Sequence, residues 1–138
     1  MPSARIERGG TRGTVFRAVA ELRIRDAKAL LDARRLNGAI YLAGYSIECY
    51  LKYAYCERSR TIHLPADLET HRWDTLVESA GLVGDLKSAP KIFGLYSALA
   101  DAWGPSLRYE TGPYHPGQAL RLYKEFSQLY QFLRELVP

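Results

Sequence analysis

Residues 37–52 read NGAIYLAGYSIECYLK, and this stretch decides the fold. Apolar and aromatic side chains follow one another here almost without interruption, and the same character continues to Arg58. A helix without a polar stripe must be covered on most of its sides, so the pattern predicts a central helix over residues 39–58. Asn37-Gly38 predicts a break in the chain directly before it, and the small residues Ala43 and Gly44 would let a neighbouring helix approach closely.

Two charged residues, Glu48 and Lys52, interrupt this apolar helix. Residues four apart lie on the same face of a helix, so we expect the two side chains to pair and to fix the register of the helix or a dimer seam. The alternative is a functional role for the carboxylate, for example in binding RNA or a nucleotide. Charges in the middle of the segment also argue against a membrane span over residues 39–56.

Outward from this segment, apolar residues recur at helical spacing on both sides. Further helices are predicted over residues 14–36, 73–79, 85–103 and 117–137. Pro90 falls in the first turns of the third of these helices, so its true start is expected near Ala89. Residues 104–117 hold three Gly and three Pro and predict a structured loop. Because no strand-like alternation is present, the sequence predicts an all-α protein, an antiparallel four- to five-helix bundle.

The chain has 138 residues, enough for one domain, and a net charge of +4. Residues 1–13, rich in Arg and Gly, predict a flexible basic arm before a helical domain over 14–138. The positive charge permits a polyanionic partner such as RNA without requiring one. Cys49 and Cys56 lie too far apart on one helix to form a disulfide, and no metal-like spacing is present. We therefore expect a cytoplasmic protein without a metal or another cofactor.

Residues 37–52 resemble the second helix of prokaryotic HEPN domains, a small-and-aromatic helix that ends in a Glu…Leu-Lys signature. Residues 71–82 look like the short element that follows it in that family, and Arg108-Tyr109 looks like the Arg-Tyr before its last long helix. The resemblance covers roughly residues 15–135. It implies a four- to five-helix bundle that is often a homodimer. Many members are ribonucleases, some are toxins paired with a small nucleotidyltransferase, and others only bind nucleotides or partners.

The ribonuclease members carry an Arg-x(4–6)-His motif at the start of the last long helix. Here Arg108 and His115 form an Arg-x(6)-His motif in the corresponding place. Metal-independent RNA cleavage needs a proton acceptor, a proton donor and a cation for the developing phosphorane charge. His115 suits the first two roles, and Arg108 suits the third. Tyr109 or Tyr114 would stack on a base or bond a phosphate, and a dimer would bring two such pairs to one cleft.

Alternatives to this catalytic hypothesis remain open. Arg58 and His63 form a second Arg-x(4)-His match in the wrong place, so the pattern has little weight without its position. Arg108-Tyr109 also suits a structural corner that caps the bundle, and His71 is expected to cap or pack. The function predicted is a metal-independent endoribonuclease of toxin or defence type. The alternative is a non-catalytic module that binds a nucleotide or a nucleotidyltransferase partner.

Overall fold

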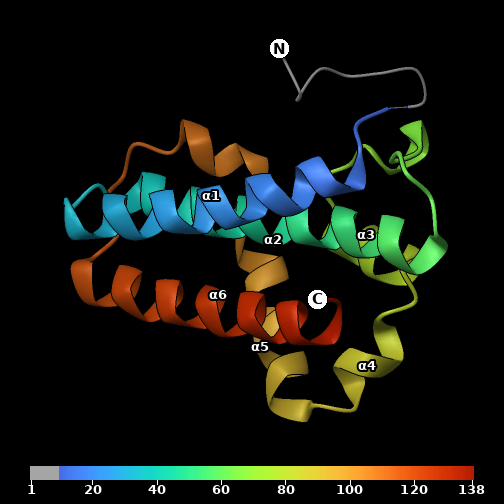
Figure 1. Cartoon of the computed structure of the whole chain (residues 1–138). Helices are drawn as coiled ribbons and strands as arrows, with labels where there is room; N and C mark the ends of the chain where they lie inside the picture. Colours follow the sequence, from blue (N-terminus) through green and yellow to red (C-terminus); the bar gives the residue numbers. More distant parts are fainter. Residues whose placement is uncertain (1–9) are drawn as a thin grey trace.

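The computed structural model describes residues 10–138, and this part of the chain is all-helical (Figure 1). Its α-helices are α1 (Gly13–Asp32), α2 (Leu36–Ser59), α3 (Trp73–Ser79), α4 (Val83–Lys87), α5 (Pro90–Ala102) and α6 (Pro116–Leu136). Two 3-10 turns, η1 (Ala66–Leu68) and η2 (Pro105–Tyr109), lie in the connecting loops. The prediction of an all-α helical bundle is confirmed at this level.

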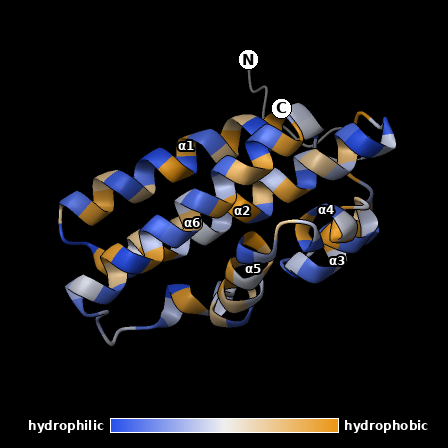
Figure 2. Cartoon of the chain, turned by 90° about the horizontal axis from the view of Figure 1, so that it is seen from below, coloured by the Kyte–Doolittle hydropathy of each residue, from blue (hydrophilic) through white to orange (hydrophobic). Residues whose placement is uncertain are grey.

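Helix α2 is the centre of the bundle, as its apolar sequence predicts. Helix α1 reverses direction into α2, and α6 runs alongside them in the same direction as α2, while α5 crosses the long helices at a steep angle (Figure 1). Apolar residues of α1 and α6 lie mainly between the helices and polar residues lie outside (Figure 2). Nearly all of α2 from Ala39 to Cys56 is buried, which explains why this helix has no polar stripe.

A row of stacked aromatic rings joins α2 to α3 and α5. Trp103, directly after α5, stacks on Tyr41 of α2 at 5.9 Å and on Trp73 of α3 at 5.6 Å between ring centroids. Its indole N–H also donates to the Tyr41 carbonyl at 3.0 Å. Gly44 allows this approach, because a Cβ atom at that position would overlap the Trp103 ring. The close neighbour of α2 that Gly44 predicted is therefore the Trp103 side chain.

Two predicted boundaries differ from the structure. The break before α2 lies at residues 33–35, where Arg34 has a left-handed backbone (φ 63) and the Arg35 N–H donates to the Leu30 carbonyl at 2.8 Å. The Asn37-Gly38 pair is helical instead, and the Asn37 side chain bonds a distant loop. Residues 85–103 form parts of two helices, because Pro90 lacks an N–H and begins α5 after Ala89, the residue at which the alternative start was expected.

The predicted arm over residues 1–13 falls largely outside the described residues, which begin at Gly10. Within the described part, the Thr11 carbonyl accepts from the Leu64 N–H at 2.8 Å, and the Gly13 N–H donates to the Ile62 carbonyl at 2.9 Å. No helix between residues 10 and 138 is long and apolar enough to cross a membrane. In the same range, no group of His, Cys, Asp and Glu residues is arranged to hold a metal ion.

Candidate functional site

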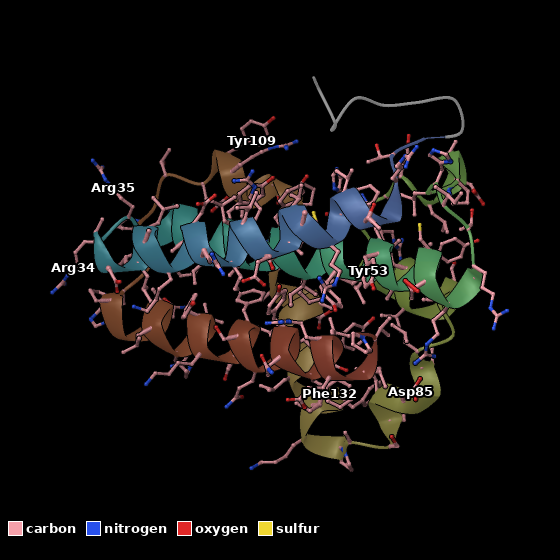
Figure 3. The ribbon with its side chains drawn as sticks, viewed as in Figure 1. Arg34, Arg35, Tyr53, Asp85, Tyr109 and Phe132 are labelled. Carbon is pink, nitrogen blue, oxygen red and sulfur yellow. The ribbon has the colours of Figure 1, made fainter. Side chains whose placement is uncertain are left out.

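Arg108 and His115 occupy the two ends of the loop that leads into α6. Arg108 lies in η2, is exposed, and has its guanidinium 5.3 Å from the centre of the Tyr109 ring. Hydrogen bonding to the Tyr41 hydroxyl, and next to that of Tyr109, raises the pKa of Arg108, so its positive charge is secure. Tyr109 is 75% exposed and extends from the surface (Figure 3), which leaves its ring available to a ligand.

Asn37, in the first turn of α2, holds this loop in place. Its side-chain amide donates to the carbonyls of Glu110 at 3.2 Å and Gly112 at 2.9 Å. Its Oδ1 atom accepts from the Tyr114 N–H at 3.1 Å. One side chain thereby provides hydrogen-bond partners for three backbone groups of a loop that has no regular secondary structure at these positions. The loop between the two motif residues is a fixed structure attached to the N-terminal turn of α2.

Replacing Asn37 by Ala is expected to free this loop, because all three hydrogen bonds end on that side chain. We expect a stability loss of about 1–2 kcal/mol and much faster amide hydrogen exchange at Tyr114. The measurement is hydrogen exchange followed by mass spectrometry or NMR. Thr61→Ala, which removes one hydrogen bond to the His63 carbonyl in another loop, is the control. Unchanged exchange at Tyr114 in the Asn37 variant would contradict the role assigned to this side chain.

His115 is the N-cap of α6, and its ring is exposed. Its Nδ1 atom accepts from the Gly117 N–H at 3.3 Å, an assignment that places the ring proton on Nε2. The ring therefore presents an N–H donor to solvent at the start of a helix, where the helix dipole favours anions. To accept a proton, His115 must give up this long bond to Gly117. The arrangement suits a phosphate group directly and base catalysis after one rearrangement.

Two further arginines lie near the same loop. Arg34 and Arg35, in the turn between α1 and α2, extend away from the bundle at this end (Figure 3). They line a shallow hollow of about 310 Å³ together with Asn37, Thr111 and Pro113. Arg34 also lines an adjoining hollow with residues 116 and 117 at the start of α6. Reasoning from the sequence missed both arginines, because their approach to the loop depends on the position of the turn.

The structure separates the roles predicted for the remaining loop residues. Tyr114 is half-buried, and burial, followed by the charge of Glu110, raises the pKa of its hydroxyl. It packs against the core and has less surface to offer a base than Tyr109. Within residues 10–138, no hydrogen bond or ion pair joins Arg108 to His115 directly. One loop carries both residues, but within the described part of a single chain no direct bond assembles them into one catalytic site.

Glu48 and Lys52 form a second polar centre, inside the bundle. The predicted pairing is confirmed, since Lys52 Nζ lies 2.9 Å from Glu48 Oε2, and both residues are buried. The other carboxylate oxygen, Oε1, lies 2.9 Å from Nδ1 of His71, which was expected only to cap or pack. Burial places these two α2 residues away from the surface that RNA would contact. The sequence did contain a signal for the contact with His71, because a buried carboxylate has two oxygens and only one partner, Lys52, was predicted for Glu48.

A cleft of about 660 Å³ opens beside His71. It is lined by His71, Trp73, Tyr96, Asp101 and Trp103, among other residues of α3 and α5. Because Glu48 is an acceptor, Nδ1 of a neutral His71 carries the proton and Nε2 is left as an acceptor on the half-exposed side of the ring. The cleft therefore has an oriented histidine, but the faces of Trp73 and Trp103 are already covered by other rings.

The second motif match is engaged in structural contacts. The Arg58 side chain pairs with Asp85 of α4 at 3.4 Å, and the backbone of His63 pairs with that of Arg12 in an isolated antiparallel β-bridge. The loop from Arg108 to His115 is therefore the more open of the two matches and is the candidate site. The chain matches no family model, no curated protein and no solved structure, so its function is to be inferred from the geometry of this site.

Proposed function

We propose that this chain is a metal-independent endoribonuclease of HEPN type, with Arg108 and His115 as its catalytic pair. The observation that supports this most is the attachment of the motif to α2. Asn37 bonds the loop at Glu110, Gly112 and Tyr114. Tyr41, one turn further along α2, raises the pKa of Arg108. Arg34 and Arg35 add positive charge beside the same loop. The HEPN assignment itself rests on the sequence pattern of residues 37–52.

The reaction follows from the chemistry of these two side chains. The 2′-oxygen of a ribose loses its proton to the His115 ring and attacks the adjacent phosphorus. Arg108 stabilises the charge that develops on the phosphorane oxygens. The bond from phosphorus to the 5′-oxygen breaks, and the leaving oxygen takes a proton from a histidine in its acid form. The products are a 2′,3′-cyclic phosphate and a free 5′-hydroxyl.

A homodimer completes this proposal chemically. One histidine cannot be base and acid in the same step, and a second copy of the chain would supply the second ring. Two copies of the Arg108–His115 loop facing one cleft would also double the positive charge around the phosphate. A toxin held inactive by a small nucleotidyltransferase partner, in the cytoplasm, is the biological setting that the family resemblance implies.

The test is RNA cleavage in the presence of EDTA. We expect wild-type protein to cut RNA and to leave 2′,3′-cyclic phosphate ends, and His115→Ala to be slower by at least about 100-fold. Arg108→Ala should lose activity similarly, because no other residue is proposed to stabilise the phosphorane. The double variant Arg58→Ala with His63→Ala, in the second motif match, is the control and should cleave like wild type. Equal activity of all variants would exclude the assigned pair.

A second candidate is a non-catalytic module that binds a nucleotide or a nucleotidyltransferase partner. It is favoured by one observation, the use of His115 Nδ1 as a helix cap, which occupies the lone pair that a base needs. In this case wild-type protein leaves RNA intact but binds a mononucleotide, and Arg108→Ala weakens that binding. Titration calorimetry with ATP and GTP separates this outcome from the first.

A further inference from the structure

Helices α1 and α6 lie side by side, and a basic groove runs between them. The groove contains a hollow of about 600 Å³ whose charged lining residues are Arg17, Glu21 and Arg25 from α1 and Arg134 from α6. Three guanidinium groups and one carboxylate therefore line the same hollow. Because a groove lined mostly by one sign of charge concentrates its field, this part of the surface favours polyanions.

The arginines are held in place by neighbouring side chains rather than left free in solvent. Glu21 accepts from the Tyr130 hydroxyl at 2.9 Å and from Arg25 at 3.0 Å, and it lies 3.8 Å from Arg134. The Tyr130 hydrogen bond, the largest contribution, lowers the pKa of Glu21, so this carboxylate stays ionised and keeps both cations near it. Exposed arginines that are already oriented lose less side-chain entropy when they bind a phosphate.

Aromatic rings orient the two outermost arginines. The Arg17 guanidinium lies 5.7 Å from the centre of the Tyr53 ring, and that of Arg134 lies 6.0 Å from the centre of the Tyr130 ring. Both rings are buried, and the Tyr53 hydroxyl donates to the Pro138 carbonyl at 2.7 Å. Buried rings cannot stack on bases, so a nucleic acid in this groove would be held by its phosphates, without sequence preference.

A second hollow lies near the proposed catalytic loop, at the other end of α1. Lys28 of α1, bonded to Asp32 at 2.8 Å, follows Arg25 along the helix in that direction. This hollow lies where the end of α1 and the turn into α2 meet the start of α6, next to the N-cap residue His115. Its charged lining residues are Asp32, which pairs with Lys28, and Arg34. The distance from the start of α6 to Arg134 is about 27 Å along the helix axis. This length suits a short single strand, within the range of about 4–16 nucleotides that such grooves hold.

We propose that the groove between α1 and α6 is a binding track for single-stranded RNA that leads to the Arg108–His115 loop. This inference rests on the proposed function, because it names the path of the substrate to that site. Arg17, Arg25 and Arg134 bind backbone phosphates at the end of the track far from His115. Arg34 binds them where the track meets the start of α6.

The experiment measures binding of a 2′-O-methyl RNA of about ten nucleotides by fluorescence anisotropy. This RNA lacks the hydroxyl needed for cleavage, so binding is read independently of catalysis. We expect the double variant Arg17→Gln with Arg134→Gln to bind about tenfold more weakly at moderate salt. The slope of log K against log salt should become shallower by about 1.4, because each lost phosphate contact contributes about 0.7 for a single strand.

Two comparison variants separate the track from a general effect of charge. Arg72→Gln removes one positive charge from an exposed arginine that pairs with Asp74 on α3, outside the groove, and should leave the slope unchanged. Glu21→Gln removes the carboxylate that competes with phosphates for Arg25 and Arg134 at the end of the track far from His115. It should tighten binding severalfold, because the gain in positive charge outweighs the looser orientation of these arginines. A residue that served only the fold would not strengthen RNA binding when it is changed, so the sign of this result supports the track.

The remaining outcomes test the track and the catalytic site separately. If the groove variant and Arg72→Gln weaken RNA binding equally for each charge removed, the effect comes from net charge alone. That result would overturn the track. Failure to bind RNA, or tighter binding to an acidic peptide of equal charge, would overturn it as well. RNA binding that depends on Arg17 and Arg134, combined with no cleavage by wild type, would support the track and reject the ribonuclease.

Discussion

Replacing Lys52 by Met is expected to lower the free energy of unfolding by about 3–5 kcal/mol. Lys52 Nζ lies 2.9 Å from a carboxylate oxygen of Glu48, and Glu48 is only 1% exposed. Methionine fills a similar volume but leaves Glu48 buried with a single partner, His71. Removing one member of a buried pair costs far more than the pair contributes, because the remaining charge stays away from water. Urea unfolding followed by far-UV circular dichroism measures the loss.

The matched control for Lys52 is Arg58→Met. Arg58 also forms an ion pair, with Asp85, but both side chains are 37% exposed and 3.4 Å apart. An exposed pair of this kind contributes about 0–1 kcal/mol, so the control should stay near wild type. The double variant Glu48→Leu with Lys52→Met should recover most of the loss, because both buried charges are then gone. A Lys52 effect no larger than that of Arg58 would show that Glu48 is stabilised by other groups.

The second large effect is expected for Gly44→Ala, at about 3 kcal/mol of destabilisation. A methyl group at position 44 overlaps the Trp103 ring, and that ring cannot move aside easily. Tyr41 and Trp73 cover its two faces, and its N–H is bonded to the Tyr41 carbonyl. The cost combines overpacking in a dense core with the partial loss of a buried hydrogen bond.

Gly94→Ala, in helix α5, is the control for Gly44. A Cβ atom at Gly94 has no neighbour within 4 Å. Alanine there should stabilise the protein by about 0.5–1 kcal/mol through its better helix propensity. The same substitution in two helices is therefore expected to have opposite signs. Urea midpoints within experimental error of each other would contradict the packing described around Trp103.

The sequence predicted the helices of this fold better than the connections between them. Helix α2 was evident from its continuous apolar run, because a helix that is buried on every side carries apolar residues on every side. The break before it was assigned to Asn37-Gly38, a strong turn signal, but the chain turns at Arg34 instead. Whether an asparagine turns the backbone or bonds a distant loop depends on tertiary contacts that local sequence does not contain.

The sequence proposed the residues of the candidate site but not the contacts that surround them. The position of Arg108 and His115 before the last helix followed from chain order alone. The contacts from Tyr41, Asn37 and Arg34 cross more than 60 residues of sequence, and no spacing rule reaches that far. The pairing of Glu48 with Lys52 was predictable because both lie on one helix. The partnership of Glu48 with His71 required the folded chain.

The aromatic row between α2, α3 and α5 also gives the protein an internal optical reporter. The chain has two tryptophans, and both belong to this row, with ring centroids 5.6 Å apart. Indole rings this close couple electronically, so they should produce a distinct near-ultraviolet circular dichroism band. All indole emission then originates at one junction between three helices. Loosening of that junction can be followed by fluorescence without any attached dye.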